Sequence, residues 1–205
     1  EKALATLDMH WTQPSALPAP QQAQLRDAWS RALQSLPEDE RLPHALVFRK
    51  SRVGANAFAL PGGTIVMTDE LVRRVGGDEA ILVGVLGHEL GHLRHRHGMR
   101  MLIQASALGA VVGVLVGDVS SLLASVPAWL GQASYSRQAE READAEALGL
   151  LRAAGVSPLV MVTFFETMGA AAGAERASGE VPAVLSTHPP DAERIAFFRA
   201  AAQGR

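Results

Sequence analysis

The chain contains no cysteine, and this absence narrows the chemistry available to it. Without thiols there are no disulfide bonds, iron–sulfur clusters or thiolate zinc sites, and a cysteine nucleophile is excluded. Any metal ion must therefore be held by histidine and carboxylate side chains.

A strong charge of either sign is missing as well. The 205 residues carry a formal net charge of -2, and the pI is near 6.4. Binding to nucleic acid through its phosphates needs a positive field, so we expect no nucleic-acid partner. With 48% hydrophobic and 20% charged residues, the composition is that of a globular protein with a substantial core.

Long hydrophobic runs are scarce. The longest one, residues 101–117, is interrupted by Gln104 and Ser106, whereas a helix needs about 20 apolar residues to cross a bilayer. A second apolar piece follows, and we expect residues 101–131 to form a helical hairpin that is buried or lies against a membrane. The chain begins without a charged and then apolar leader, so we expect a targeting segment to be absent or already removed.

Local patterns predict a mostly helical α+β fold, with residues 1–20 as an N-terminal arm and residues 21–205 as a single domain. Apolar alternation on both sides of Pro61-Gly62-Gly63 predicts a β-hairpin. The other expected elements are a strand at 45–50, helices at 21–36, 79–99, 138–154, 158–168 and 190–202, and a mobile loop of small residues at 170–179.

The helix expected to begin after Asp78 is apolar on nearly every face between residues 80 and 93, which predicts a central position in the domain. Gly84, Gly87 and Gly91 each cost this helix about 1 kcal/mol relative to alanine. We therefore expect another element to pack closely against these glycines.

Within this helix, His88-Glu89-Leu90-Gly91-His92 forms an H-E-x-x-H motif. The i, i+4 spacing places both imidazoles on one face, where they can hold a zinc ion, and Glu89 lies beside them to transfer a proton. A metal ion would also offset the cost of burying these polar groups.

Zinc needs a third protein ligand, and the richest acidic cluster lies in the helix predicted at 138–154. The apolar stripe of this helix places Glu140 inward and Glu142 outward. Glu140 is therefore predicted as the third ligand, and Asp144 as the acceptor of a ring N–H from a ligating histidine. The alternative is that these carboxylates lie at the surface and pair with Arg137 and Arg141.

Four motifs together resemble the BepA-like and HtpX-like zinc peptidases of bacteria, which are similar in turn to the CAAX prenyl endopeptidases. The segments run in the order found in that family: Asn56-Ala-Phe-Ala-Leu-Pro-Gly-Gly63, Leu86-Gly-His-Glu-Leu-Gly-His-Leu93 followed by Arg96-His97, Tyr135-Ser-Arg-Gln-Ala-Glu-Arg-Glu-Ala-Asp144, and Thr187-His-Pro-Pro190 with Arg194. The resemblance implies a gluzincin-type peptidase domain whose small sheet has an edge strand lining the active site.

It further implies one Zn²⁺ per chain, held by His88, His92 and Glu140, with Glu89 as the catalytic base and Arg194 supporting the site with Asp144. His188 is expected to face the zinc as a second catalytic residue, either as a resting ligand that blocks the site or as an oxyanion donor. A purely structural histidine is the alternative.

The strand formed by Asn56, Ala57, Phe58 and Ala59 is expected to bind substrate through its backbone. The histidines and arginines between Arg94 and Arg100 resemble a second metal cluster, but we interpret them as solvated cations that complement the end of a helix.

The sequence thus predicts a zinc metalloendopeptidase that acts on unfolded or misfolded proteins in a bacterial periplasm or cell envelope, with possible association with the membrane surface. Two alternatives stay open. One is a zinc-bound, chaperone-like binding module with a closed site, and the other is a membrane-embedded protease.

Overall fold

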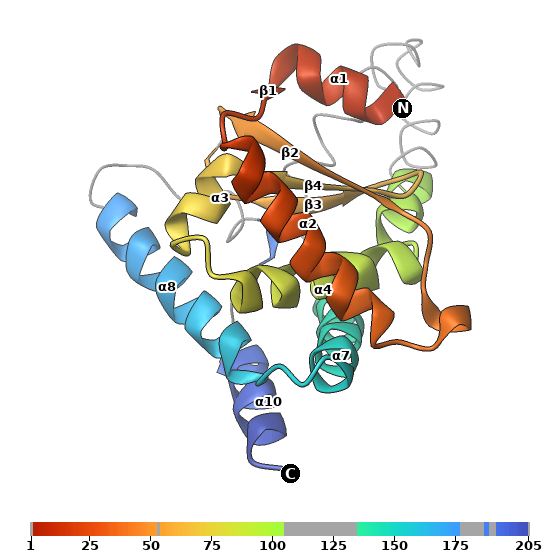
Figure 1. Ribbon diagram of the computed structural model, residues 1–205, viewed down its shortest axis with the longest axis vertical. Coiled ribbons are helices and arrows are strands. Elements are labelled where there is room, and N and C mark those ends of the chain that lie inside the picture. The colour runs from red at the N-terminus through yellow and green to blue at the C-terminus, as the bar shows by residue number, and fades with distance from the viewer. Residues whose placement is uncertain (1, 53, 105–134, 177–186, 189–191, 205) are drawn as a thin grey trace, which may run out of the picture.

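A computed structural model describes residues 2–52, 54–104, 135–176, 187–188 and 192–204 (Figure 1). Within these ranges the chain is mostly helical, with a small four-stranded mixed sheet, as the α+β prediction states. The elements are α1 (Lys2–His10), β1 (Thr12–Pro14), α2 (Ala19–Gln34), the 3₁₀ turn η1 (Glu38–Glu40), β2 (Ala45–Ser51), β3 (Ala57–Leu60), β4 (Thr64–Thr68), α3 (Asp69–Arg74), α4 (Glu79–Arg94), α7 (Arg137–Ala153), α8 (Leu159–Arg176) and α10 (Ala192–Ala202).

The sheet has the strand order β1-β2-β4-β3, so β3 lies at one edge. Strands β3 and β4 pair antiparallel, which confirms the predicted hairpin, while β2 and β4 pair parallel. The turn between β3 and β4 requires glycine, because Gly62 and Gly63 have φ angles of 103° and 88°. Strand β3 packs against α4, which brings this edge to the central helix.

Residues 1–20, expected to form an N-terminal arm, contain regular secondary structure. Residues 2–10 form α1, and β1 pairs antiparallel with β2 through the register Thr12↔Ser51. The prolines that suggested an arm occupy positions that tolerate them. Pro14 ends an edge strand, and Pro20 lies in the first turn of α2, where a missing N–H costs no helical hydrogen bond.

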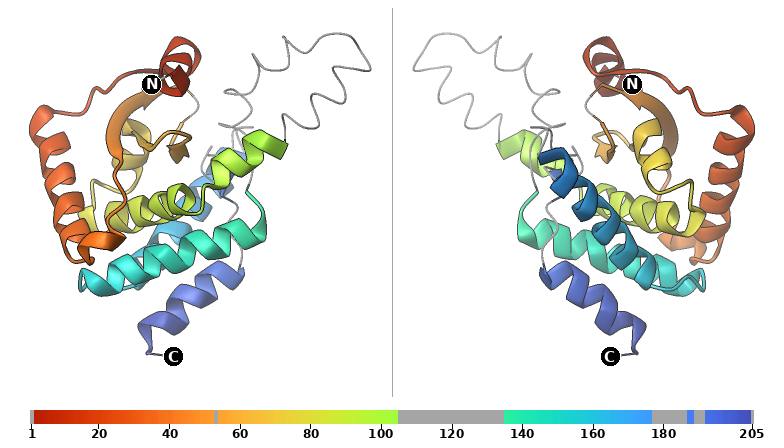
Figure 2. Two further views of the ribbon diagram at one scale, coloured as in Figure 1. Left: turned by 90° about the vertical axis from the view of Figure 1, so that its right-hand side faces the viewer. Right: turned by 90° about the vertical axis from the view of Figure 1, so that its left-hand side faces the viewer.

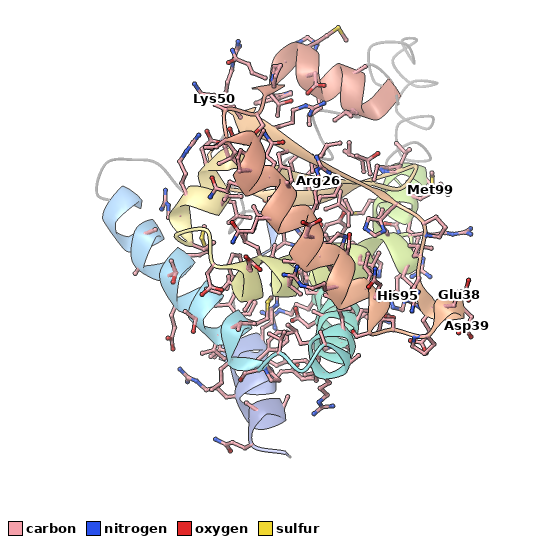
Figure 3. All side chains as sticks on the ribbon, viewed as in Figure 1. Arg26, Glu38, Asp39, Lys50, His95 and Met99 are labelled. Carbon is pink, nitrogen blue, oxygen red and sulfur yellow. The ribbon has the colours of Figure 1, made fainter. Side chains whose placement is uncertain are left out.

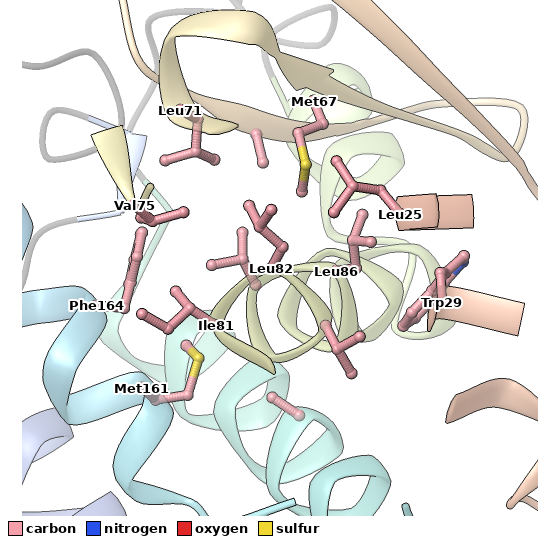
Figure 4. Close-up of a cluster of buried hydrophobic side chains, with 14 of the residues drawn as sticks. Leu25, Trp29, Met67, Leu71, Val75, Ile81, Leu82, Leu86, Met161 and Phe164 are labelled. Carbon is pink, nitrogen blue, oxygen red and sulfur yellow. The ribbon is translucent and has the colours of Figure 1, made fainter. Parts of the chain in front are cut away.

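Helix α4 lies at the centre of the hydrophobic core, between α2, α7, α8 and the sheet (Figures 1 and 4). Its N-cap is Asp78, whose carboxylate accepts a hydrogen bond from Ile81 N at 3.0 Å. The expected close packing against its glycines is confirmed. A Cβ added at Gly84 would lie 2.7 Å from Met161 Sδ, and one at Gly91 would lie 2.8 Å from Ala143 Cα. Helix α7 therefore runs alongside α4 at very short range (Figure 2).

Two predicted boundaries are wrong. Helix α4 ends at Arg94 instead of near Met99, because Arg96 adopts a left-handed φ of 54° before residues 97–104 become helical again. Residues 170–176, expected in a mobile loop, continue α8 to Arg176. Alanine is the best helix former, and the alanines of that segment outweigh its one glycine, Gly173.

The predicted apolar hairpin at 101–131 lies outside the described residues except for 101–104, which are helical. Within the described ranges, we find no helix that is both long and apolar enough to cross a membrane.

Candidate metal centre

Four side chains converge in the interior beside α4. His88 and His92 come from α4, Glu140 from α7, and His188 from a short described segment, and each is buried. One potential ligand atom from each lies within 4.8 Å of those of the other three. The Nε2 atoms of His88 and His92 are 3.0 Å apart, as their positions one turn apart on α4 predict.

The orientation of α7 places Glu140 in this group. Ser136 caps the helix by accepting a hydrogen bond from Ala139 N at 3.2 Å. The Glu140 carboxylate then lies 3.4 Å from His88 Nε2 and 3.5 Å from His92 Nε2. Glu142 points away from the group, as its helical phase predicts.

The donor set fits a zinc ion. His88 Nδ1 donates to Asp144 Oδ1 at 2.9 Å, which leaves the Nε2 lone pair directed into the group. Glu89 Oε2, Glu140 Oε2 and His188 Nε2 are buried and have no hydrogen-bond partner among the described residues. Buried acceptors without a hydrogen-bond donor are costly, and a cation relieves that cost; of these atoms, Glu140 Oε2 has an ion pair with Arg194. Two imidazoles and a carboxylate are the ligand types of catalytic zinc sites.

Burial and mutual charge shift the pKa values of these groups in opposite directions. Burial favours the neutral form of His88, but the carboxylates of Glu140 and Asp144 outweigh it and raise the pKa of His88 to about 9. Burial lowers the pKa of His92. For Glu140, burial is opposed and outweighed by the imidazoles of His188 and His88, which hold its pKa below the ordinary value. The positive charge of protonated His88 is therefore stabilised by the carboxylates of Glu140 and Asp144.

Glu89 lies at the edge of the same group. It is almost fully buried, and its Oε1 is 3.5 Å from His188 Nε2. Burial raises its pKa, although His188, His88 and the backbone N–H of Ala59 partly oppose the shift. A raised pKa makes the Glu89 carboxylate a stronger base, which favours its taking up a proton.

Arg194 of α10 supports the site by pairing with the carboxylates of Asp144 and Glu140. Its Nε and Nη2 atoms each donate to one oxygen of Asp144 at 2.7 Å, a bidentate pair. Its Nη1 also lies 2.7 Å from Glu140 Oε2, as an ion pair that lacks hydrogen-bond alignment. Although burial alone would raise the pKa of Asp144, Arg194 and His88 lower it, so the carboxylate that holds His88 stays ionised.

The basic segment after α4 was predicted to be solvated, but part of it is buried. His97 is buried, its Nδ1 is 2.9 Å from His92 Nδ1, and its Nε2 is 2.9 Å from Glu142 Oε2. Tyr135 was also missed, and its ring stacks on His92 with centroids 3.9 Å apart. The only signals for these residues were Arg96-His97 and Tyr135 within the matched motifs. His95 is closer to solvent, on the side of the molecule where Glu38 and Asp39 lie (Figure 3).

The predicted substrate strand lies beside Glu89. The backbone of Asn56 is already used, since its N–H donates to Thr68 Oγ1 at 2.8 Å and its carbonyl accepts from Thr68 N at 2.9 Å. Alternation along an antiparallel pair then turns the backbone groups of Ala57 and Ala59 away from β4. The Asn56 side chain instead lies 3.5 Å from Thr187 Oγ1, which ties the strand to the segment of His188.

Comparison with known proteins agrees with this site. Residues 19–202 match the model of "Peptidase family M48". The chain is 30% identical over 151 residues to "Metalloprotease YcaL" of Escherichia coli (strain K12), covering 70% of this chain and 57% of the relative. It is 34% identical over 158 residues to "Beta-barrel assembly-enhancing protease" of the same organism, covering 70% and 31%. It is 34% identical over 147 residues to "Mitochondrial metalloendopeptidase OMA1" of Arabidopsis thaliana, covering 68% and 28%.

The chain thus spans between about a quarter and just over half of the length of these curated relatives. The family match covers nearly the whole of this chain and includes the H-E-x-x-H helix, Glu140 and Arg194. This chain therefore belongs to peptidase family M48, a family of zinc metalloproteases.

Proposed function

We propose that the protein is a zinc-dependent metalloendopeptidase that cleaves extended segments of unfolded or misfolded proteins in a bacterial periplasm or cell envelope. The observation that carries the proposal is the position of Glu89. Its buried carboxyl has a raised pKa, and one of its oxygens lacks a hydrogen-bond partner among the described residues, beside the His88–His92–Glu140 group. A buried acid that is only partly satisfied is costly to maintain, and general-base chemistry explains its presence.

His88, His92 and Glu140 would hold one zinc ion per chain, and Asp144 and Arg194 keep His88 and Glu140 oriented. When bound, zinc supplies a Lewis acid that polarises a carbonyl oxygen and acidifies water. Glu89 takes the proton of the attacking water and delivers it to the amine of the leaving peptide. The position of Glu89 on the same helix as two ligands fixes this geometry without a mobile loop.

The edge strand β3 is the proposed substrate site, although Ala57 and Ala59 are themselves buried. The outward backbone groups of Ala57 and Ala59 can add an extended peptide as a further strand, and Phe58 lies between them. Because the Ala59 N–H also faces Glu89, a peptide on this edge passes the catalytic carboxylate. Backbone pairing demands little of substrate side chains, which suits unfolded chains of many sequences. The role of Asn56 is to hold the strand, since its backbone is engaged with Thr68.

His188 is proposed as a latch. Its Nδ1 is 3.0 Å from Glu140 Oε1 and 3.2 Å from His88 Nε2, so it reaches the same point as the three ligands. A catalytic zinc site keeps one position open, and a fourth protein ligand closes it. A mobile loop at 170–179 would let the His188 segment swing away, but residues 170–176 are helical. His188→Ala should raise the turnover number if His188 is a latch and lower it, with zinc retained, if it is an oxyanion donor. Unchanged kinetics with a lower melting temperature would leave it a structural residue.

The envelope location and the unfolded substrates draw support from the relative named for enhancing β-barrel assembly. The chaperone-like alternative predicts zinc binding without turnover, so casein hydrolysis with and without a chelator separates it from a protease. The membrane-embedded alternative predicts that the purified protein partitions into detergent or lipid, whereas a peripheral protease stays in the aqueous phase.

The decisive experiment compares wild type with Glu89→Gln. The amide keeps the shape of the side chain but cannot act as a base, so we expect hydrolysis of casein to be abolished and zinc content to stay at one per chain. Activity near the wild-type level in the Gln variant contradicts the proposed mechanism.

A further inference from the structure

An interruption of the helix after α4 places the ring of His97 against the ring of His92. In a continuous helix, residues five apart are rotated by about 140° around the axis, so His97 would point away from its neighbour. Arg96 instead adopts a φ of 54°, and the two imidazole centroids are 5.0 Å apart. A left-handed conformation is uncommon for a residue other than glycine and tends to mark functional positions.

The hydrogen bond between His92 and His97 can have only one of the two rings as its donor. Only one hydrogen fits between the two Nδ1 atoms, which are 2.9 Å apart. If His92 donates it, the Nε2 lone pair of His92 faces Glu140 and His88, as a metal ligand requires. His97 then carries its own proton on Nε2 and donates it to Glu142 Oε2 at 2.9 Å. Glu142, a carboxylate that can only accept, is steadied by Gln138 Nε2 at 3.0 Å.

The opposite arrangement, in which His97 donates to His92, is unfavourable both at His92 and at Glu142. A proton on His97 Nδ1 would force the proton of neutral His92 onto Nε2, so that His92 could not bind a metal. It would also leave the bare Nε2 of His97 facing the Glu142 carboxylate, two acceptors without a hydrogen between them. Glu142 therefore selects the arrangement in which His92 is ready to bind zinc.

We propose that His97 and Glu142 are positioning residues that fix the tautomer and the ring orientation of His92 for zinc. The inference rests on the proposed zinc site and adds a second support to it. His88 is held directly by the Asp144 carboxylate, whereas His92 is held by the Glu142 carboxylate through an intervening histidine. Loss of such a partner reduces metal affinity about 10–100-fold in zinc proteins.

A second cation site is the rival interpretation of the same residues. His95, His97 and Glu142 each offer an atom within 4.8 Å of the others. However, an ion on His97 Nε2 would move its proton to Nδ1, the direction that disables His92. His95 is moreover paired with Glu146 at 3.0 Å. The geometry is consistent with a positioning role and opposes a second ion that coexists with the first.

The test is zinc affinity of the purified, metal-free chain, measured by competition with a chromophoric chelator. His97→Leu should weaken zinc binding at least about 10-fold. His97→Asn places an amide oxygen near the position of Nδ1, so it should recover most of the lost affinity. The matched control is His95→Leu. His95 stacks on His97 and its Nδ1 lies 3.8 Å from Glu142 Oε2, but it is not part of the hydrogen-bonded chain from Glu142 to His92, so its loss should change the affinity far less than His97→Leu. Glu142→Ala lies partly at the surface, so folding is little affected, and it should weaken affinity while still binding one zinc at saturation.

Melting of the metal-free variants separates positioning from general damage, because rescue by His97→Asn should occur without a matching change in melting temperature. The cobalt-substituted His97→Leu variant should also show an altered visible spectrum. Equal zinc affinity in wild type, His97→Leu and Glu142→Ala would overturn the inference and leave the proposed function intact. Loss of a second equivalent of zinc from His97→Leu, with the first unaffected, would favour the cation site instead. A wild-type chain that binds no zinc would contradict the proposed function itself.

Discussion

The contact between α4 and α7 can be tested by adding one methyl group at Gly91. Its Cβ would lie 2.8 Å from Ala143 Cα and 3.1 Å from Ala143 O. Carbon atoms in contact are about 3.5 Å apart or more, so the helices must separate by about 0.7 Å. These are backbone atoms of a helix and cannot rotate away. Overpacking of this kind costs about 1–3 kcal/mol, against a gain of about 1 kcal/mol in helix propensity.

Gly91→Ala should therefore lower the free energy of unfolding by up to about 2 kcal/mol. It should also weaken zinc binding, because Gly91 adjoins His92 and Ala143 lies one turn from Glu140. The matched control is Gly149→Ala, also in a helix, where an added Cβ meets nothing within 4 Å. The control should raise the free energy of unfolding by about 0.4–1 kcal/mol. Urea denaturation of the metal-free proteins measures both. If Gly91→Ala is as stable as Gly149→Ala, the close approach of α4 and α7 is not as described.

Three further outcomes are expected. Glu140→Ala should lose stoichiometric zinc while Glu142→Ala keeps it at saturation, measured by metal analysis, and the reverse pattern would exclude Glu140 as the third ligand. Since His88 has a pKa of about 9 without metal, it is protonated at pH 7, so zinc binding should release about one proton and tighten as the pH rises toward 9. Calorimetry in two buffers of different ionisation enthalpy counts that proton, and uptake instead of release would contradict the assignment. Ala59→Pro removes an edge N–H and should raise the Michaelis constant with zinc retained, and unchanged peptide kinetics would place the substrate elsewhere.

Features set by local spacing could be predicted from the sequence. The two histidines of the motif, the inward phase of Glu140 and the hairpin turn at Gly62 each depend on residues within about one helical turn or one loop. The close packing at Gly91 was also predictable, since a glycine in a buried helix is costly unless another element needs the space.

The position of His97 could not be predicted in the same way. The glycine at the break, Gly98, already lies in the helical segment that follows, and it is Arg96 that takes a conformation its residue type disfavours. Tertiary packing decides such a position, and the expectation of solvated cations at the helix end therefore did not hold for the buried His97. The N-terminal strand β1 was missed for a related reason, because three residues carry too little pattern and depend on pairing with β2.

The C-terminal helix also shares in the integrity of the metal centre. The buried residues of α10 are Arg194 and Phe198, and the Arg194 guanidinium is sandwiched between the carboxylates of α7 and the ring of Phe165, 4.7 Å from its centroid. Proteolytic removal of this helix would leave two buried carboxylates without their cation, a defect that typically costs about 3–5 kcal/mol. Loss of this helix is therefore expected to abolish activity even though Glu89 is unchanged. Intact α10 is required because it supplies the cation that pairs with the carboxylates of α7.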